Sequence, residues 1–361
     1  MDAVKQTASA VANAVTPGSN QTILVTGGSG FVAAHVLNSF LEGGYKVRTT
    51  VRSEATADKV RKTHKKYTES GQLTFAIVKD VAESGAFDEA VKGVDGVVHT
   101  ASPFQLSVEN NVRDLLDPAV KGTTEILEAI HKYNPGVKRV VVTASFASII
   151  DLSKGLRPGH VYTEADWNPV TWDEAANTPI GAIAYCASKA FAEKAAFKFV
   201  EEKKPNFTVA TICPPMIYGP NAHYVDDFAK LNTSSAEIYA FIKGDKTEPG
   251  DAAFPAFADV RDVAEAHLKA YEKEEAAGQR YFITSGTYSN QQVCDVIRKH
   301  FPELRNRVPE GTPGAPLADM WGVDNSKAGR ELGIKFRTLE ETIVDNVKNL
   351  LELEKSLAKT A

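Results

Sequence analysis

Tyr185 and Lys189 are the residues whose types and spacing most directly suggest chemistry. They stand four positions apart in Tyr185-Cys186-Ala187-Ser188-Lys189, and in a helix that spacing places both side chains on one face, one turn apart. A phenol with an ordinary pKa of roughly 10 is a weak acid–base partner near neutrality, and a nearby ammonium favours its ionised form. The pair therefore predicts proton transfer, with Tyr185 as donor and Lys189 as its activator. The same spacing also arises by chance, as a core tyrosine beside a surface lysine.

Ser145 follows a run with the composition of a buried strand, Val140-Val141-Val142-Thr143-Ala144. The run is apolar and then abruptly polar, which places a hydroxyl at the carboxyl end of the strand, where open parallel sheets bind ligands. From there Ser145 could donate a hydrogen bond to a carbonyl oxygen that gains negative charge during a reaction. Without the phenol and the ammonium, Ser145 would be interpreted as the first residue of a loop.

A strand, a glycine turn and the start of a helix follow one another in Ile23-Leu24-Val25-Thr26-Gly27-Gly28-Ser29-Gly30-Phe31-Val32-Ala33. In such a unit Gly27 lets the chain turn tightly, Gly30 leaves room for a pyrophosphate, and Ala33 allows close packing of the helix on the strand. The N-terminus of the helix then faces the negative charge. The segment predicts a dinucleotide site with contacts from Thr26, Gly27, Gly30, Phe31 and Val32.

The end of the second predicted strand indicates which dinucleotide binds. A site for NAD usually presents Asp or Glu there, whereas this chain reads Arg48-Thr49-Thr50-Val51-Arg52-Ser53. Arg52 could hold a 2′-phosphate through two charge-assisted hydrogen bonds, so we predict NADP(H). After the third strand, Asp80 is expected to accept from the adenine amine while Val81 packs nearby. Arg52 could instead be an exposed charge at a strand end, and Asp80 a turn residue.

Short apolar strands alternate with segments of helical length from residue 21 onward, which is the pattern of a parallel sheet covered by helices on both faces. The predicted strands are 22–26, 46–51, 73–78, 96–100, 138–143 and 208–213. The predicted crossover helices are 31–41, 55–67, 87–91, 110–132 and 184–202. A further helix at 260–271 and strand at 280–284 then return to the main sheet.

We therefore expect an α/β fold with two interleaved lobes. The larger lobe is a Rossmann-type doubly wound parallel sheet that binds NADP(H), formed by residues 21–213 and 258–285. The smaller, mostly helical lobe binds the substrate and takes residues 214–257 and 286–361, while residues 1–20 form a flexible N-terminal arm.

The composition of the 361 residues limits the partners. A net charge of -5 disfavours nucleic acid and anionic membranes, because both need a basic face. Neither a secretory signal nor an apolar run of roughly 20 residues occurs, and three scattered cysteines suggest neither a zinc site nor disulfides. We expect a cytoplasmic protein without a metal, although a weak mitochondrial presequence with Lys5 as its one basic residue is an alternative.

These motifs together resemble the extended short-chain dehydrogenase/reductases, in the branch that contains dihydroflavonol reductases and fungal aldehyde and methylglyoxal reductases. The two residues between Gly27 and Gly30 give the spacing of that superfamily. Further segments that carry the resemblance are His99-Thr100-Ala101-Ser102-Pro103-Phe104, Trp167-Asn168-Pro169, Phe191-Ala192-Glu193-Lys194-Ala195-Ala196 and Asp259-Val260-Arg261-Asp262-Val263-Ala264.

The resemblance implies an NADPH-linked reduction of a small carbonyl compound, such as methylglyoxal, a diketone, a ketoester or an aryl ketone, by a monomer or homodimer. Tyr185 would protonate the carbonyl oxygen, and Lys189 would also hold the nicotinamide ribose. Further cofactor contacts are implied for Thr100, Ala101, Ser102, Thr143, Pro214, Met216 and Ile217. Phe104, Phe146, Ile150 and Met216 would line the substrate pocket, although each could equally be a core residue.

Three departures from the family pattern affect the expected contacts. Ala119 replaces the helix Asn that serves many short-chain enzymes as a proton relay, so no relay is expected there. Cys213-Pro214 replaces the family's Asn-Pro, which weakens the expected carboxamide contacts. The Asn-Trp-Tyr-Cys-Tyr-type motif of cinnamoyl-CoA reductases is absent, which disfavours a thioester substrate. His99 and His223 are further candidate acids, but nothing in the sequence pairs them with a base.

Two other functions stay open at this point. A sugar-nucleotide epimerase or dehydratase shares the fold and the Ser, Tyr and Lys set but holds its NAD tightly, and Arg52 argues against it. A redox-sensing binding protein would keep the glycine turn but lose Tyr185 and Lys189, which this chain retains. Free exchange of NADPH would favour a reductase, whereas a cofactor retained through gel filtration and dialysis would favour an epimerase.

Overall fold

The computed structural model describes residues 20–102 and 108–358. Its centre is a seven-stranded sheet in which all neighbouring strands are parallel. In spatial order the strands are β10 (Arg280–Phe282), β7 (Thr208–Cys213), β5 (Arg139–Thr143), β4 (Gly96–His99), β1 (Thr22–Thr26), β2 (Lys46–Val51) and β3 (Leu73–Ile77). The order reverses at β1, and at such a point open α/β sheets bind ligands beyond the carboxyl ends of their strands.

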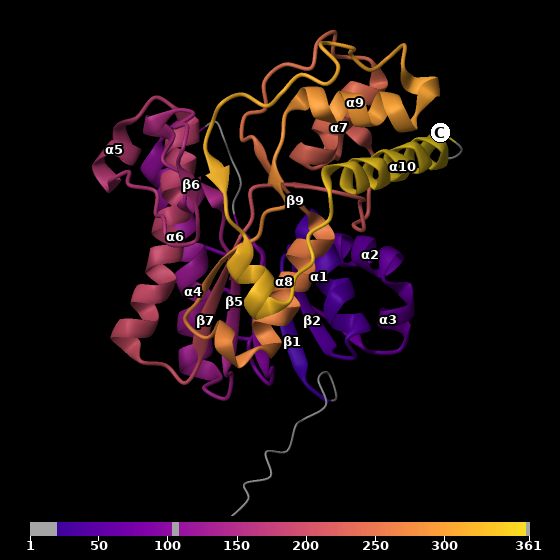
Figure 1. Ribbon diagram of the computed structural model, residues 1–361. Helices are drawn as coiled ribbons and strands as arrows, with labels where there is room; N and C mark the ends of the chain where they lie inside the picture. The colour runs from indigo at the N-terminus through magenta and orange to yellow at the C-terminus, as the bar shows by residue number, and fades with distance from the viewer. Residues whose placement is uncertain (1–19, 103–107, 359–361) are drawn as a thin grey trace, which may run out of the picture.

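Both faces of the large sheet are buried under helices. Within β1, Ile23 and Val25 join a core formed with α1 (Phe31–Glu42), α2 (Glu54–Thr63) and α8 (Val260–Glu272), whereas Leu24 points to the opposite core. That second core is covered by α4 (Asp117–Tyr133) and α6 (Gly181–Lys203), which pack against each other (Figure 1). Near-continuous Val and Ile content in the strands reflects this burial on both sides.

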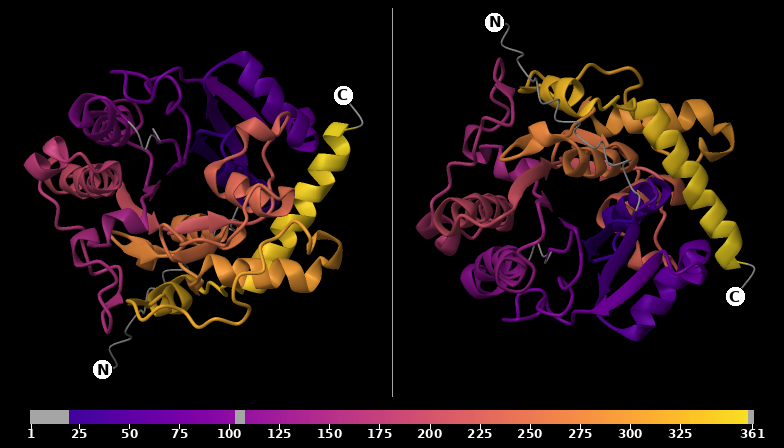
Figure 2. Two further views of the ribbon diagram at one scale, coloured as in Figure 1. Left: turned by 90° about the horizontal axis from the view of Figure 1, so that it is seen from above. Right: turned by 90° about the horizontal axis from the view of Figure 1, so that it is seen from below.

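A smaller lobe sits on the carboxyl ends of the strands (Figure 1). It contains α7 (Thr233–Lys243), α9 (Asn290–His300), α10 (Leu339–Ala358) and a three-stranded sheet of β8 (Met216–Tyr218), β9 (Ala256–Asp259) and β11 (Gly286–Thr287). The helices enclose an apolar core of their own around Phe241, Ile297 and Val347. Figure 2 shows α10 running along one side of the molecule, next to α9.

The remaining elements are short. Residues 65–69 form α3 (Lys65–Glu69), and α5 (Trp172–Asn177) precedes α6. A two-stranded sheet joins β6 (Val161–Tyr162) to β12 (Gly322–Val323). The π-helical turns are Val112–Leu116 and Ala328–Leu332, and the 3-10 turns are Phe146–Ser148, Leu152–Lys154, Phe228–Lys230, Glu274–Ala276 and Pro302–Leu304.

The structure confirms the predicted doubly wound sheet, with strand ends within one or two residues. Two helix predictions were wrong. Residues 87–91 lie in consecutive turns, because the apolar spacing of Phe87 and Val91 serves burial in the core rather than a helix. The helix expected at 55–67 is split at His64 into α2 and α3.

The division into lobes stays a prediction, and two segments cross its boundaries. Ala328, Leu332 and Ile334, assigned to the substrate lobe, pack in the core of the large sheet. Residues 161–162, assigned to the cofactor domain, pair with residues 322–323. No helix among residues 20–102 and 108–358 is long and apolar enough to cross a membrane, and the same residues contain no cluster of metal-ligating side chains.

Candidate active site

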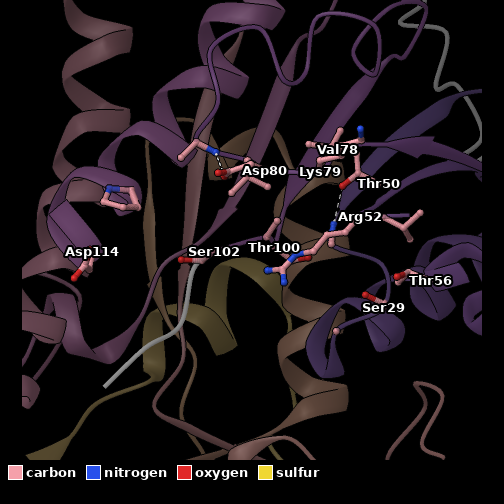
Figure 3. A pocket seen from close by; sticks show the side chains of 17 residues that line it. Ser29, Thr50, Arg52, Thr56, Val78, Lys79, Asp80, Thr100, Ser102 and Asp114 are labelled. Carbon is pink, nitrogen blue, oxygen red and sulfur yellow. Dashed lines mark hydrogen bonds between the residues drawn. The ribbon is translucent and has the colours of Figure 1, made fainter. Parts of the chain in front are cut away.

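A cavity of about 770 Å³ lies beyond the carboxyl ends of β1, β2, β3 and β4 (Figure 3). Eight of the predicted cofactor residues line it: Gly27, Gly30, Arg52, Asp80, Val81, Thr100, Ala101 and Ser102. Further lining residues are Ser29, Thr50, Val51, Thr56, Val78, Lys79, Ala82, Asp114 and Pro118. The cavity thus collects the segments that follow four neighbouring strands, although they are far apart in the sequence.

The glycine turn between β1 and α1 forms one wall of the cavity. Gly27 has a φ of 73°, a conformation that favours glycine, and its N–H donates to Thr50 Oγ1 at 3.0 Å. Sequence analysis missed the role of Gly28, where an added Cβ would lie 2.1 Å from Thr49 Oγ1. The Gly27-Gly28 dipeptide was a signal for such close packing, but its partner on β2 could not be identified from the sequence.

Thr26 connects the glycine turn to the residues that follow β4. Its buried hydroxyl oxygen accepts from the N–H groups of Thr100 and Ala101, at 3.1 and 3.0 Å, and lies 3.0 Å from His99 Nδ1. Burial lowers the pKa of His99 to about 4, with a smaller contribution from the charge of Lys189. His99 is therefore neutral near pH 7 and supports the turn.

The part of the cavity beyond β2 and β3 contains two cations. Arg52 and Thr100 line the same space (Figure 3), and Lys79, which sequence analysis did not single out, lies at the end of β3. Within the described residues neither Arg52 nor Lys79 forms an ion pair, so both could balance the charge of a phosphate. Asp80 Oδ1 accepts from the N–H of Ala82 at 2.9 Å, which fixes the turn that Val81 belongs to.

The three residues predicted for proton transfer come from two elements. Tyr185 and Lys189 lie on α6, and Ser145 lies two residues after the end of β5, where it caps the 3-10 turn Phe146–Ser148. Tyr185 forms a side-chain hydrogen bond with Ser145, and Lys189 Nζ lies 5.8 Å from the centre of the Tyr185 ring. Lys189 Nζ also donates to Ser102 Oγ at 2.7 Å, and Ser102 lines the cavity, so Lys189 connects this group of side chains to the cavity wall.

Burial controls the protonation of this group. It raises the pKa of Tyr185 above its ordinary value, Cys186 adds to the rise, and the hydrogen bond with Ser145 opposes it. The phenol therefore keeps its proton near neutrality, the form that a proton donor requires. Burial also lowers the pKa of Lys189 to about 8, so Lys189 is mostly charged near pH 7 and becomes neutral in mildly alkaline solution.

Several other predicted contact residues lie close to the Ser145 turn. The Phe146 N–H donates to the carbonyl oxygen of Pro214 at 2.8 Å, which places the segment with Met216 and Ile217 beside it. Thr143 has its hydroxyl 2.7 Å from Nε2 of His267 on α8. The Nδ1 of His267 lies 2.7 Å from a carbonyl oxygen and must donate to it, so the Thr143 hydroxyl donates to Nε2.

The predicted substrate pocket is only partly described. Phe104 lies outside the described residues. Phe146 and Ile150 are 1% and 3% exposed, and the Phe146 ring stacks on Phe282 with the ring centres 4.9 Å apart, a placement that favours core packing for both. Met216 is partly buried against the core of the smaller lobe.

Two further residues predicted to contact the cofactor, Phe31 and Val32, lie on α1, and the Phe31 ring meets the His223 ring edge-on.

Comparisons with known proteins identify the family and several relatives of this chain. Residues 23–284 match the model of the NAD dependent epimerase/dehydratase family. The ketoreductase azaE of Aspergillus niger is 42% identical, with 91% of this chain and 97% of that protein covered. The NADPH-dependent methylglyoxal reductase GRE2 of Saccharomyces cerevisiae is 35% identical, with 92% and 99% covered. The solved structure of the yeast methylglyoxal/isovaleraldehyde reductase Gre2 with NADPH has a TM-score of 0.84 and 34% identity, with 93% and 99% covered.

Proposed function

This chain belongs to the NAD dependent epimerase/dehydratase family, and from that premise we propose that it is an NADPH-dependent carbonyl reductase that converts small aldehydes and ketones to alcohols. The names of its relatives, a ketoreductase and an NADPH-dependent methylglyoxal reductase, support this activity. They also confirm the resemblance to the extended short-chain dehydrogenase/reductases. The observation that carries the proposal is the 2.7 Å hydrogen bond from Lys189 to Ser102, because Ser102 lines the dinucleotide cavity and Lys189 shares a helix face with Tyr185.

The residues around the cavity fit NADPH. In the glycine turn an added Cβ would lie against Ala101 at Gly27 and against Thr49 at Gly28, so the absence of side chains lets the turn pack closely there. Arg52 and Lys79 offer positive charge at the end of the cavity proposed for the adenosine. Arg52 is the proposed partner of the 2′-phosphate, because its fork of N–H donors matches phosphate oxygens. When bound, NADPH supplies the hydride that reduces the carbonyl carbon.

We assign the proton chemistry to Tyr185, Ser145 and Lys189. Ser145 Oγ accepts from the N–H of Ala147 at 3.1 Å, so its single hydroxyl proton, shared with Tyr185 in the free site, is the one that it would donate to the substrate oxygen. Tyr185 gives its proton to that oxygen as negative charge develops there, and the charge of Lys189 stabilises the phenolate that remains. A proton from solvent then restores the phenol, so each turnover adds one hydride and one proton to the carbonyl group.

The substrate class and the assembly are proposed from the family. A small carbonyl compound, such as methylglyoxal, a diketone, a ketoester or an aryl ketone, would enter between the Ser145 turn and the segment with Met216. The chain would act as a monomer or homodimer, with the larger lobe holding NADPH and the smaller lobe binding the substrate.

The test is to follow NADPH oxidation with that panel of carbonyl compounds and to compare the wild type with Tyr185→Phe. Loss of a general acid costs about 10²–10⁴-fold in rate, so kcat should fall by this much. The Kd for NADPH should change little, because the phenol acts on the carbonyl oxygen. A Tyr185→Phe enzyme with near wild-type turnover would contradict the assignment.

A further inference from the structure

Glu193 is a buried carboxylate on the same helix as the proton donor. It stands four residues after Lys189 and eight after Tyr185 on α6, so the three side chains lie along one face of the helix. Glu193 is 2% exposed. The proposed reaction does not use it, and a charge at such depth needs partners that compensate for the loss of water.

Arg280 on β10 is the main partner of Glu193. The guanidinium donates to both carboxylate oxygens, with Nε 2.8 Å from Oε1 and Nη2 3.0 Å from Oε2. Its Nη1 donates to the carbonyl oxygens of Glu164 and Asp166, and its Cζ lies 3.4 Å from the centre of the Trp167 ring. The pair therefore ties α6 to the edge of the large sheet and to the loop before α5.

Ser148 links this ion pair to Ser145, the residue that caps the 3-10 turn Phe146–Ser148. Its hydroxyl is directed at Glu193 Oε2 and lies 2.6 Å from the carbonyl oxygen of Ser145, so its single proton is shared between the two acceptors. The N–H of Ser148 also donates to the Ser145 carbonyl at 2.9 Å, and Ser148 is fully buried. The backbone of Ser145 is thus held, through one hydroxyl, by a carboxylate on the helix that carries Tyr185.

We propose that Glu193, oriented by Arg280 and acting through Ser148, is a positioning residue that sets the place of the Ser145 hydroxyl relative to Tyr185. This inference rests on the proposed carbonyl reduction. Buried ion pairs contribute little net stability compared with apolar residues of the same size, so fixing the geometry of the site is the gain that explains this one. A displacement of about 1 Å in a catalytic group can cost about 10²-fold in rate.

The experiment compares two variants, each of which removes one hydroxyl group that donates a hydrogen bond to Glu193. Ser148→Ala breaks the connection to Ser145. Thr211→Val is the matched control, because the Thr211 hydroxyl on β7 donates to Glu193 Oε1 at 2.6 Å and, within the described part of the chain, forms no hydrogen bond with residues 145–148. Ser148→Ala should lower kcat by about 10–100-fold with an unchanged Kd for NADPH, whereas Thr211→Val should retain kcat.

A double-mutant comparison separates positioning from general loosening. If Ser148 acts only through Ser145, then Ser148→Ala should cause no further loss of kcat in a Ser145→Ala enzyme. Equal losses in Ser148→Ala and Thr211→Val, or an undiminished loss in the Ser145→Ala background, would overturn the inference. Should Ser148→Ala fail to fold, Ser148→Cys keeps the volume with a weak donor and takes its place in the same comparison.

The outcome is distinguishable from failure of the proposed function. A wild-type enzyme that oxidises NADPH with none of the carbonyl compounds would reject the proposed function itself. An active wild type with full activity in Ser148→Ala would reject only the positioning role of Glu193.

Discussion

Arg52 is the residue that we propose to select NADPH over NADH. Hydrogen bonds to charged groups contribute about 1.5–3 kcal/mol each, so Arg52→Ala should raise the KM for NADPH by about 10–100-fold. The KM for NADH should change little, since NADH has no 2′-phosphate. Steady-state kinetics with both cofactors measure this difference.

A control for the loss of charge comes from the same strand. Lys46 is exposed at the opposite end of β2, so Lys46→Ala removes one positive charge far from the cavity and should leave both KM values unchanged. An equal rise in both KM values for Arg52→Ala would show that Arg52 does not select the phosphate.

Lys189 should make cofactor use depend on pH. Burial lowers the pKa of Lys189 to about 8, so its charged form predominates below that pH and is lost above it. The ratio kcat/KM for NADPH reports the free enzyme. It should therefore be level below pH 8 and fall about tenfold for each further pH unit above it.

Lys189→Arg tests the cause of this decline. Arginine stays charged throughout the accessible range, so the residual activity of this variant should not fall in the same interval. A wild-type profile that stays level to about pH 10, near the ordinary pKa of lysine, would contradict a lowered pKa for Lys189.

The sequence indicated those residues of the candidate site that local spacing places together. Tyr185 and Lys189 are one helical turn apart, Gly27 directly follows a strand that could be recognised, and Ser145 lies two residues after another. Other residues of the site depend on contacts between distant segments: Gly28 faces Thr49, Lys79 shares a cavity with Arg52, and Ser148 joins Glu193 to Ser145. No spacing in one sequence indicates which strands will be neighbours, so these roles required the structure.

At the scale of elements, periodicity predicted the strands better than the helices. Continuous Val and Ile runs are distinctive, and β1, β2 and β7 begin and end at the predicted residues. The segment 87–91 has two apolar residues at helical spacing, yet Gly85 and Gly93, with φ values of 76° and 68°, flank a series of turns. Phe87 and Val91 are both buried in the same core although the chain between them forms turns, so two apolar residues four positions apart do not by themselves indicate a helix.

The close contact between β1, α1 and β2 leads to a prediction for Gly28. In Gly28→Ala the new Cβ would lie 2.1 Å from Thr49 Oγ1 and 3.0 Å from Thr49 Cβ, so the glycine turn must move away from β2. Overpacking of this kind costs about 1–3 kcal/mol. We expect a lower Tm and weaker NADPH binding, measured by thermal unfolding and fluorescence titration.

Thr49→Ala should partly restore the Gly28→Ala protein, because it removes the nearest atom. It also removes the hydrogen bond from Thr49 to the carbonyl oxygen of Val25, which is 2.8 Å long, so recovery should be incomplete. If the double variant were no better than Gly28→Ala, the clash with Thr49 would not be the cause.

At the scale of the molecule, the chain crosses between its lobes more often than the sequence indicated. The predicted boundaries follow changes in composition and stay a prediction. Residues 328–334 return to the large core between α9 and α10, two helices of the smaller lobe. Their composition resembles that of the neighbouring helical segments, so the packing of Leu332 and Ile334 against α8 was visible only in three dimensions.

The location of the cavity on the larger lobe implies that NADPH binds the folded chain and not the unfolded one. Binding at a free concentration of about 100 times Kd should then stabilise the protein by about 2.7 kcal/mol, which thermal unfolding would show as a higher Tm. NADH at the same concentration should give a smaller rise, and Arg52→Ala should remove the difference between the cofactors.

A reductase must release its oxidised cofactor in every cycle, so dialysis should return the protein to the Tm measured without NADPH. A cofactor that survives gel filtration and dialysis, with a Tm that does not respond to added NADPH, would instead indicate the tightly held NAD of an epimerase.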